Sequence, residues 1–116
     1  MSKIAGILLI IAGGLTILLG AKDLGRYAQL TPYAVWSSIA LGVIMILAGL
    51  AHFRAPHKSF LLSIPILVTF LIHIYSVGLF YNVANIGLFL AGHAVAAVLI
   101  LALSYLGYRR VQAVAV

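Results

Sequence analysis

Four long apolar runs occupy most of this chain, and each is about the length that a helix needs to cross a lipid bilayer. A helix rises about 1.5 Å per residue, so roughly 20 residues span the hydrocarbon layer of about 30 Å. The runs show no barrel-like alternation, and helices satisfy their own backbone groups in lipid. We predict an all-α integral membrane protein with transmembrane helices at residues 4–21, 33–53, 59–80 and 85–108.

Composition supports a lipid environment. Apolar residues make up 66% of the 116 residues and charged residues only 7%, whereas a soluble domain has about 45–50% and about 25%. A soluble fold of this size leaves too much surface exposed to hide so many apolar side chains. Short connections favour one domain, an up-down antiparallel bundle. The first run could instead be a signal peptide, but Leu19 is poorly suited to the cleavage motif, so we predict a retained helix.

Basic residues predict the orientation. Five of the seven would lie on the side of both termini, and two on the other: Lys3, Arg54, Lys58, Arg109 and Arg110 against Lys22 and Arg26. Basic loops favour the cytoplasmic side, which places the N- and C-termini in the cytoplasm. Because these charges flank apolar runs, we expect contact with membrane lipids rather than nucleic acid. The predicted location is the cell membrane, as a multi-pass protein of a prokaryotic plasma membrane.

Glycine recurs at a spacing that favours close helix contact. The segment from Gly6 to Gly13 matches the pattern from Gly42 to Gly49, 36 residues later. Small residues on one face let helix backbones approach each other in lipid. The predicted helix-packing residues are Gly6, Gly13, Gly20, Gly42, Gly49 and Gly92. The partner helices belong either to the same chain or to another transmembrane subunit.

The predicted spans contain no acidic residue, since the only acid of the chain is Asp23. Ion-coupled carriers and proton relays usually hold a carboxylate within the membrane, so the lack of a carboxylate in the spans argues against both functions. The chain also has no cysteine, which excludes disulfides and thiolate sites. No phosphate loop or nucleophile motif is present, so we predict no catalytic residue and no metal site.

His73 and His93 are the candidate cofactor-binding residues. Each is about ten residues from the turn between the third and fourth runs, so both would lie at one depth, some 15 Å below it. Haem b held by two axial histidines is one hypothesis. Neighbouring helices pack about 8–10 Å apart, which is too close for a porphyrin unless the hairpin splays. A second hypothesis is a quinone pocket. The simplest alternative is that both histidines are structural and form hydrogen bonds across helices.

The other polar residues lie near the predicted span ends. His52 and His57 flank basic residues of the 54–58 connection, so we expect both in a solvated cluster that contacts lipid headgroups. Asn82 and Asn85 are expected to cap helices at the opposite turn.

Three functions remain open. The first is a non-enzymatic membrane subunit that packs into a homo-oligomer or a larger complex. The second is a small b-type cytochrome or quinone-binding electron-transfer protein that uses His73 and His93. The third is a pore or carrier for a neutral or anionic solute, lined by Thr69, Ser76 and the two asparagines, Asn82 and Asn85.

Overall fold

The computed structural model is built from helices. It describes the backbone of residues 2–27, 32–80 and 85–115, and the side chains of residues 2–18, 36–76, 79 and 85–110. The helices are α1 (Ser2–Tyr27), α2 (Pro32–Ala51), α3 (Pro56–Phe80) and α4 (Ile86–Ala115). The prediction of an all-α chain with four helices is confirmed for the described residues, which contain no strand.

Two helical segments are long and apolar enough to cross a membrane, judged by length and composition: Pro56–Ser76 in α3 and Ile86–Arg110 in α4. The apolar stretches found in the other two helices, Ser2–Leu18 and Trp36–Ala51, are shorter within the residues described. Insertion of all four helices into a bilayer therefore stays a prediction.

The helix ends differ from the predicted span ends. α4 continues to Ala115, beyond Tyr108, because no proline or glycine interrupts the basic segment that follows. α2 ends at Ala51, two residues before the predicted end. There the chain makes a tight turn, in which the N–H groups of residues 52–54 each donate to the carbonyl three residues earlier. α3 then begins at Pro56, a residue well suited to a helix start.

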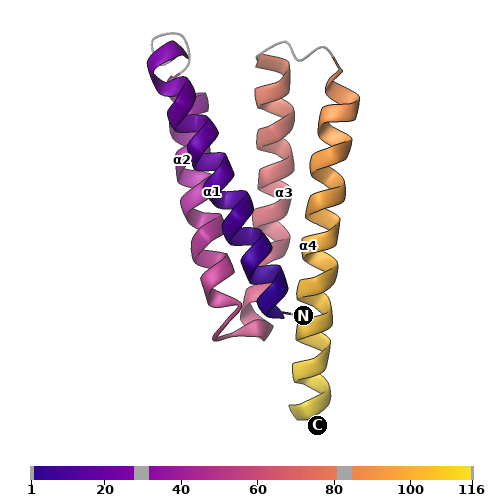
Figure 1. Ribbon diagram of the computed structural model, residues 1–116. Helices are drawn as coiled ribbons and strands as arrows, with labels where there is room; N and C mark the ends of the chain where they lie inside the picture. Colours follow the sequence, from indigo (N-terminus) through magenta and orange to yellow (C-terminus); the bar gives the residue numbers. More distant parts are fainter. Residues whose placement is uncertain (1, 28–31, 81–84, 116) are drawn as a thin grey trace.

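The helices form two hairpins, α1 with α2 and α3 with α4 (Figure 1). The N-terminus, the α2–α3 connection and the C-terminal part of α4 lie toward one end of the bundle (Figure 1). We call this the basic end, because Lys3, Arg54, Lys58, Arg109 and Arg110 all belong to it. α1 comes close to α4 only there, and it runs away from α4 toward the opposite end (Figure 1).

Glycines join α1 and α2 at two levels. A Cβ built on Gly6 would lie 2.5 Å from the carbonyl oxygen of Gly49, and one built on Gly49 would lie 2.6 Å from that of Gly6. Gly13 and Gly42 have the same relation, at 2.6 Å in both directions. Any side chain there would collide with backbone, so the close approach of α1 and α2 requires glycine at these positions.

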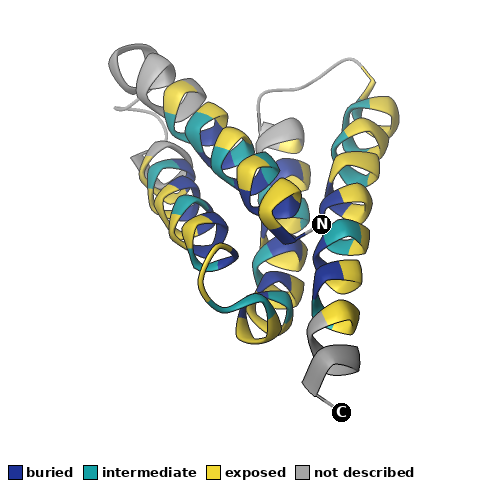
Figure 2. Ribbon diagram, turned by 60° about the horizontal axis from the view of Figure 1, so that its bottom comes forward, coloured by how far each residue is buried: buried dark blue, intermediate teal, exposed yellow. Residues whose placement is uncertain are grey.

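Buried residues lie along the helix faces turned toward the inside of the bundle, and exposed residues lie along the outer faces (Figure 2). Many of the exposed residues are large and apolar. All four helices contribute to the apolar core, which consists of Leu9, Leu41, Met45, Ala48, Leu67, Phe70, Ile74, Ala97 and Ile100. Large apolar residues such as Leu18, Leu47, Ile72 and Val98 are more than half exposed. Such a surface is unusual for a soluble monomer and suits contact with lipid.

Replacing Gly13 with alanine tests the α1–α2 contact. The new Cβ would meet the Gly42 carbonyl, and moving two backbones apart should cost about 1–3 kcal/mol. Gly14→Ala is the matched control, because no atom lies within 4 Å of its added Cβ. Thermal unfolding in mild detergent should show a clear loss of stability for G13A and little change in stability for G14A. Equal effects of the two substitutions would contradict the close contact.

Candidate functional site

A buried polar cluster at the basic end centres on His52, which is 1% exposed. Its Nδ1 lies 2.7 Å from the Ala48 carbonyl oxygen, and its Nε2 lies 2.8 Å from Ser104 Oγ of α4. Ser2 Oγ of α1 donates to the His52 carbonyl at 3.0 Å. His52 therefore bonds to both the first and the last helix of the chain.

The hydrogen-bond partners determine where the imidazole proton lies. A carbonyl oxygen can only accept, so Nδ1 must carry a proton and donate to Ala48. In a neutral ring Nε2 is then an acceptor, and the Ser104 hydroxyl donates to it. The arrangement therefore suits a neutral His52 with both nitrogen atoms paired.

Two serines of α3 complete the cluster. Ser63 Oγ donates to the Ser59 carbonyl at 2.7 Å and lies 3.4 Å from His52 Nε2, which is a weak contact. Ser59 is 1% exposed, and its hydroxyl has no partner among the described residues. The four side chains of His52, Ser59, Ser63 and Ser104 form what we call the His52 cluster. A buried hydroxyl without a partner is rare, since its desolvation is not compensated.

The structure corrects the prediction for His52. This residue was expected in a solvated cluster that contacts lipid headgroups, but it is buried and hydrogen-bonded. The reason is the tight turn after α2, which keeps His52 on the buried face of the helix. His57, unlike His52, is exposed. Its ring stacks on that of Tyr108, with the two ring centroids 4.7 Å apart.

A signal for the buried position was present in the sequence. Leu41, Met45 and Ala48 are buried on one face of α2, and His52 follows at the next helical interval. Ser59 and Ser63 are likewise separated by four residues, which places them on one face of α3. The basic residues beside His52 indicate a solvated position, whereas the helical spacing of the buried residues indicates a buried one. The prediction followed the basic residues and was therefore wrong.

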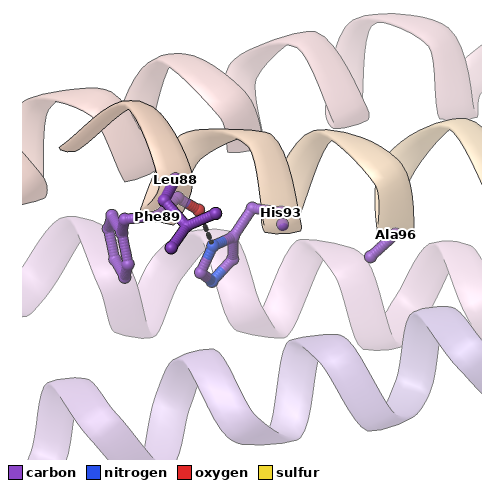
Figure 3. A pocket seen from close by; sticks show the side chains of 5 residues that line it. Leu88, Phe89, His93 and Ala96 are labelled. Atoms are coloured by element: carbon purple, nitrogen blue, oxygen red, sulfur yellow. Dashed lines mark hydrogen bonds between the residues drawn. The ribbon is translucent and has the colours of Figure 1, made fainter. Parts of the chain in front are cut away.

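A second feature is a pocket of about 400 Å³ beside α4, lined by Leu88, Phe89, Gly92, His93 and Ala96. Figure 3 shows the side chains of Phe89 and His93 projecting from the same side of the helix. His93 Nδ1 donates to the Phe89 carbonyl at 2.8 Å, so the Nε2 of the neutral ring remains an acceptor. Its ring lies edge-on to Phe89, with centroids 4.7 Å apart.

His73 has a different environment. Its Nε2 lies 2.8 Å from Ser38 Oγ, which joins α3 to α2. The ring of His93 contacts Phe70, which precedes His73 by three residues, so the two histidines lie within about one helical turn of the same level. No hydrogen bond or ring contact joins them among the described residues, and His73 does not line the pocket. Whether they bind haem b or a quinone stays a prediction.

The other predicted residues have varied surroundings. Gly6, Gly13, Gly42 and Gly49 pack within the chain, whereas a Cβ on Gly92 would meet nothing within 4 Å. Thr69 and Ser76 are exposed and donate to carbonyls of their own helix, those of Pro65 and Ile72. Asn85 caps α4, because its Oδ1 accepts from the Leu88 N–H. The surroundings of Gly20 and the position of Asn82 lie outside the described residues.

No protein family, no curated protein and no solved structure matches this chain.

Removing the hydroxyl of Ser104 or of Ser59 tests the His52 cluster. Ser104→Ala deprives the buried Nε2 of its donor, so the free energy of unfolding should fall by about 1–3 kcal/mol. Ser59→Ala removes a buried hydroxyl that has no partner, so stability should be unchanged or slightly higher. Thermal unfolding in detergent near pH 7.5 measures both. A larger loss for S59A than for S104A would mean that Ser59 has a partner in solution.

Proposed function

We propose that this chain is a four-span membrane protein with both termini in the cytoplasm, and that it acts as a non-enzymatic subunit that binds a neighbouring transmembrane helix along α4. The apolar outer surface and the basic end support the membrane part of this proposal. The observation that carries the subunit part is the open face of α4. No other helix of the described chain fills the space beside Gly92.

The open face has the pattern of a helix-binding surface. Leu88 and Val95 are 71% and 69% exposed, and Leu99 is also exposed. Together with Gly92 they recur at intervals of three or four residues, so they line one side of the helix. A small residue between larger apolar ones allows a second helix to approach closely in lipid. The repeated glycines Gly6, Gly13, Gly42 and Gly49 already pack inside the chain, whereas Gly92 of α4 is open to a partner.

A second candidate function rests on His93. Its Nε2 is an acceptor beside an apolar pocket. Such a site suits either a lipid-soluble molecule that carries a hydroxyl group or a haem whose iron the nitrogen would bind. A quinol would donate to Nε2, whereas haem b would bind through it. In His73 the corresponding nitrogen is already bonded to Ser38, so a haem held by both residues requires that bond to break.

Single cysteines test the four spans. The chain has no cysteine, so each introduced thiol is the only one present. In intact cells a membrane-impermeant thiol reagent should label Lys22→Cys and leave Lys58→Cys and Arg110→Cys unlabelled until the cells are opened. Labelling of position 58 in intact cells would contradict the proposed orientation. Equal labelling of all three positions in intact cells would contradict membrane insertion.

The protein purified from its own membrane tests the proposed partner. Native mass spectrometry in mild detergent should show a complex with a second copy or with another membrane protein, and Gly92→Leu should reduce it to a monomer. Gly14→Leu is the matched control, since that glycine also faces open space but lies on α1. A colourless monomer in the unmodified protein would contradict the subunit proposal.

The same sample distinguishes the second candidate function by its absorption spectrum. A Soret band that disappears in His93→Ala would support haem binding. Quinone extracted from the unmodified protein and absent from H93A would support a quinone site. A band that persists in both His73→Ala and His93→Ala would assign the pigment to other residues.

A further inference from the structure

His52, in the turn after α2, bonds to both α1 and α4 at the basic end. Ser2 of α1 and Ser104 of α4 both bond to His52, and Ser2 also packs against α4. A Cβ built on Gly107 would lie 2.6 Å from the Ser2 Cβ, so α1 and α4 are in close contact here. Toward the opposite end α1 leaves α4 (Figure 1). The attachment of α1 to α4 is therefore concentrated beside one imidazole ring.

The surroundings of His52 favour its neutral form on structural grounds. Among the described residues, the hydrogen-bonding groups beside the ring are the Ser63 and Ser104 hydroxyls and the Ala48 carbonyl, and the Ser2 hydroxyl bonds to the backbone carbonyl of His52; all are uncharged. The charged and titratable side chains that flank the cluster along the chain supply no negative charge: Lys3, Arg54, His57, Lys58, Tyr105, Tyr108, Arg109 and Arg110. The only acid, Asp23, stands 21 residues after Ser2, about 30 Å along α1.

A proton on Nε2 would place a buried positive charge in this environment. Ser104 Oγ can accept a hydrogen bond from the charged ring, but one hydroxyl does not replace the lost hydration. Ser63 Oγ can also accept, because its own proton goes to the Ser59 carbonyl, but at 3.4 Å from Nε2 this bond would be weak. The surrounding basic residues add repulsion. The charged ring is therefore stable only when the cluster admits water.

We propose that His52 is a proton-binding site that controls the attachment of α1 and α4 at the basic end. With a neutral ring the cluster is closed and the two helices are held together. When the ring takes up a proton, the turn at residues 52–55 moves toward water and the bonds from Ser2 and Ser104 are lost. The closed state thus prevails at higher pH, and the open state appears as the pH falls through the range where histidine titrates. This inference is independent of the proposed α4 partner.

Spin labels at the basic end test the proposal. The exposed residues Ile4 of α1 and Leu106 of α4 are replaced by cysteine and labelled, in the otherwise cysteine-free chain within lipid bilayers. Pulsed EPR distances are measured from about pH 7 down to about pH 5, a window in which histidine is the side chain that ordinarily titrates. We expect a longer second distance to appear on acidification and to disappear on return to pH 7.

The four histidines provide matched variants. His57→Gln is the closest control, because His57 lies in the same connection but is exposed. His57→Gln, His73→Gln and His93→Gln should each keep the response, and His52→Gln should abolish it. If H52Q does not fold, retention of the response in the other three variants assigns it to His52 by elimination. The proposal is overturned by an unmodified protein whose distance does not change, by a response that persists in H52Q, or by its loss in one of the other three variants.

Discussion

The contact of α1 with α2 through paired glycines determines much of the remaining arrangement. Gly6 lies against Gly49 and Gly13 against Gly42, so two points nearly two helical turns apart hold the backbones together. The direction of α1 then follows from that of α2, which brings Ser2 to α4 at the basic end and leads α1 away from α4 farther along the chain. The pocket beside His93 lies along that part of α4.

This geometry separates two kinds of polar residue that look alike in the sequence. His52 lies where all four helices contribute atoms, and its bonds are completed by serines of three different elements. His93 lies farther along α4, where α1 is no longer beside that helix (Figure 1). Among the described residues its ring bonds to the preceding turn and packs against aromatic rings. The first environment favours a structural or proton-binding role. The second leaves an acceptor nitrogen for an external molecule.

The sequence predicts the helices well because apolar length is a local property. It also identifies the glycine faces, since the repeat from Gly6 to Gly13 and from Gly42 to Gly49 follows helical spacing. It does not reveal which faces meet, so it leaves open whether these glycines pack within the chain or between subunits. The prediction for His52 was wrong for a related reason. Charged neighbours suggested solvent, whereas the turn after Ala51 continues the buried face that Met45 and Ala48 begin.

The contrast between His52 and His57 explains why a proton is the relevant ligand for this cluster. The two residues are five positions apart and have the same basic neighbours, yet His57 is exposed and His52 is buried. His52 is buried, and the only acidic side chain of the chain, Asp23, belongs to the opposite end of α1. A buried charge without a partner must either be lost or open its surroundings. Because the surroundings of His52 are also the attachment of α1 to α4, the uptake of a proton and the packing of these helices are thermodynamically linked.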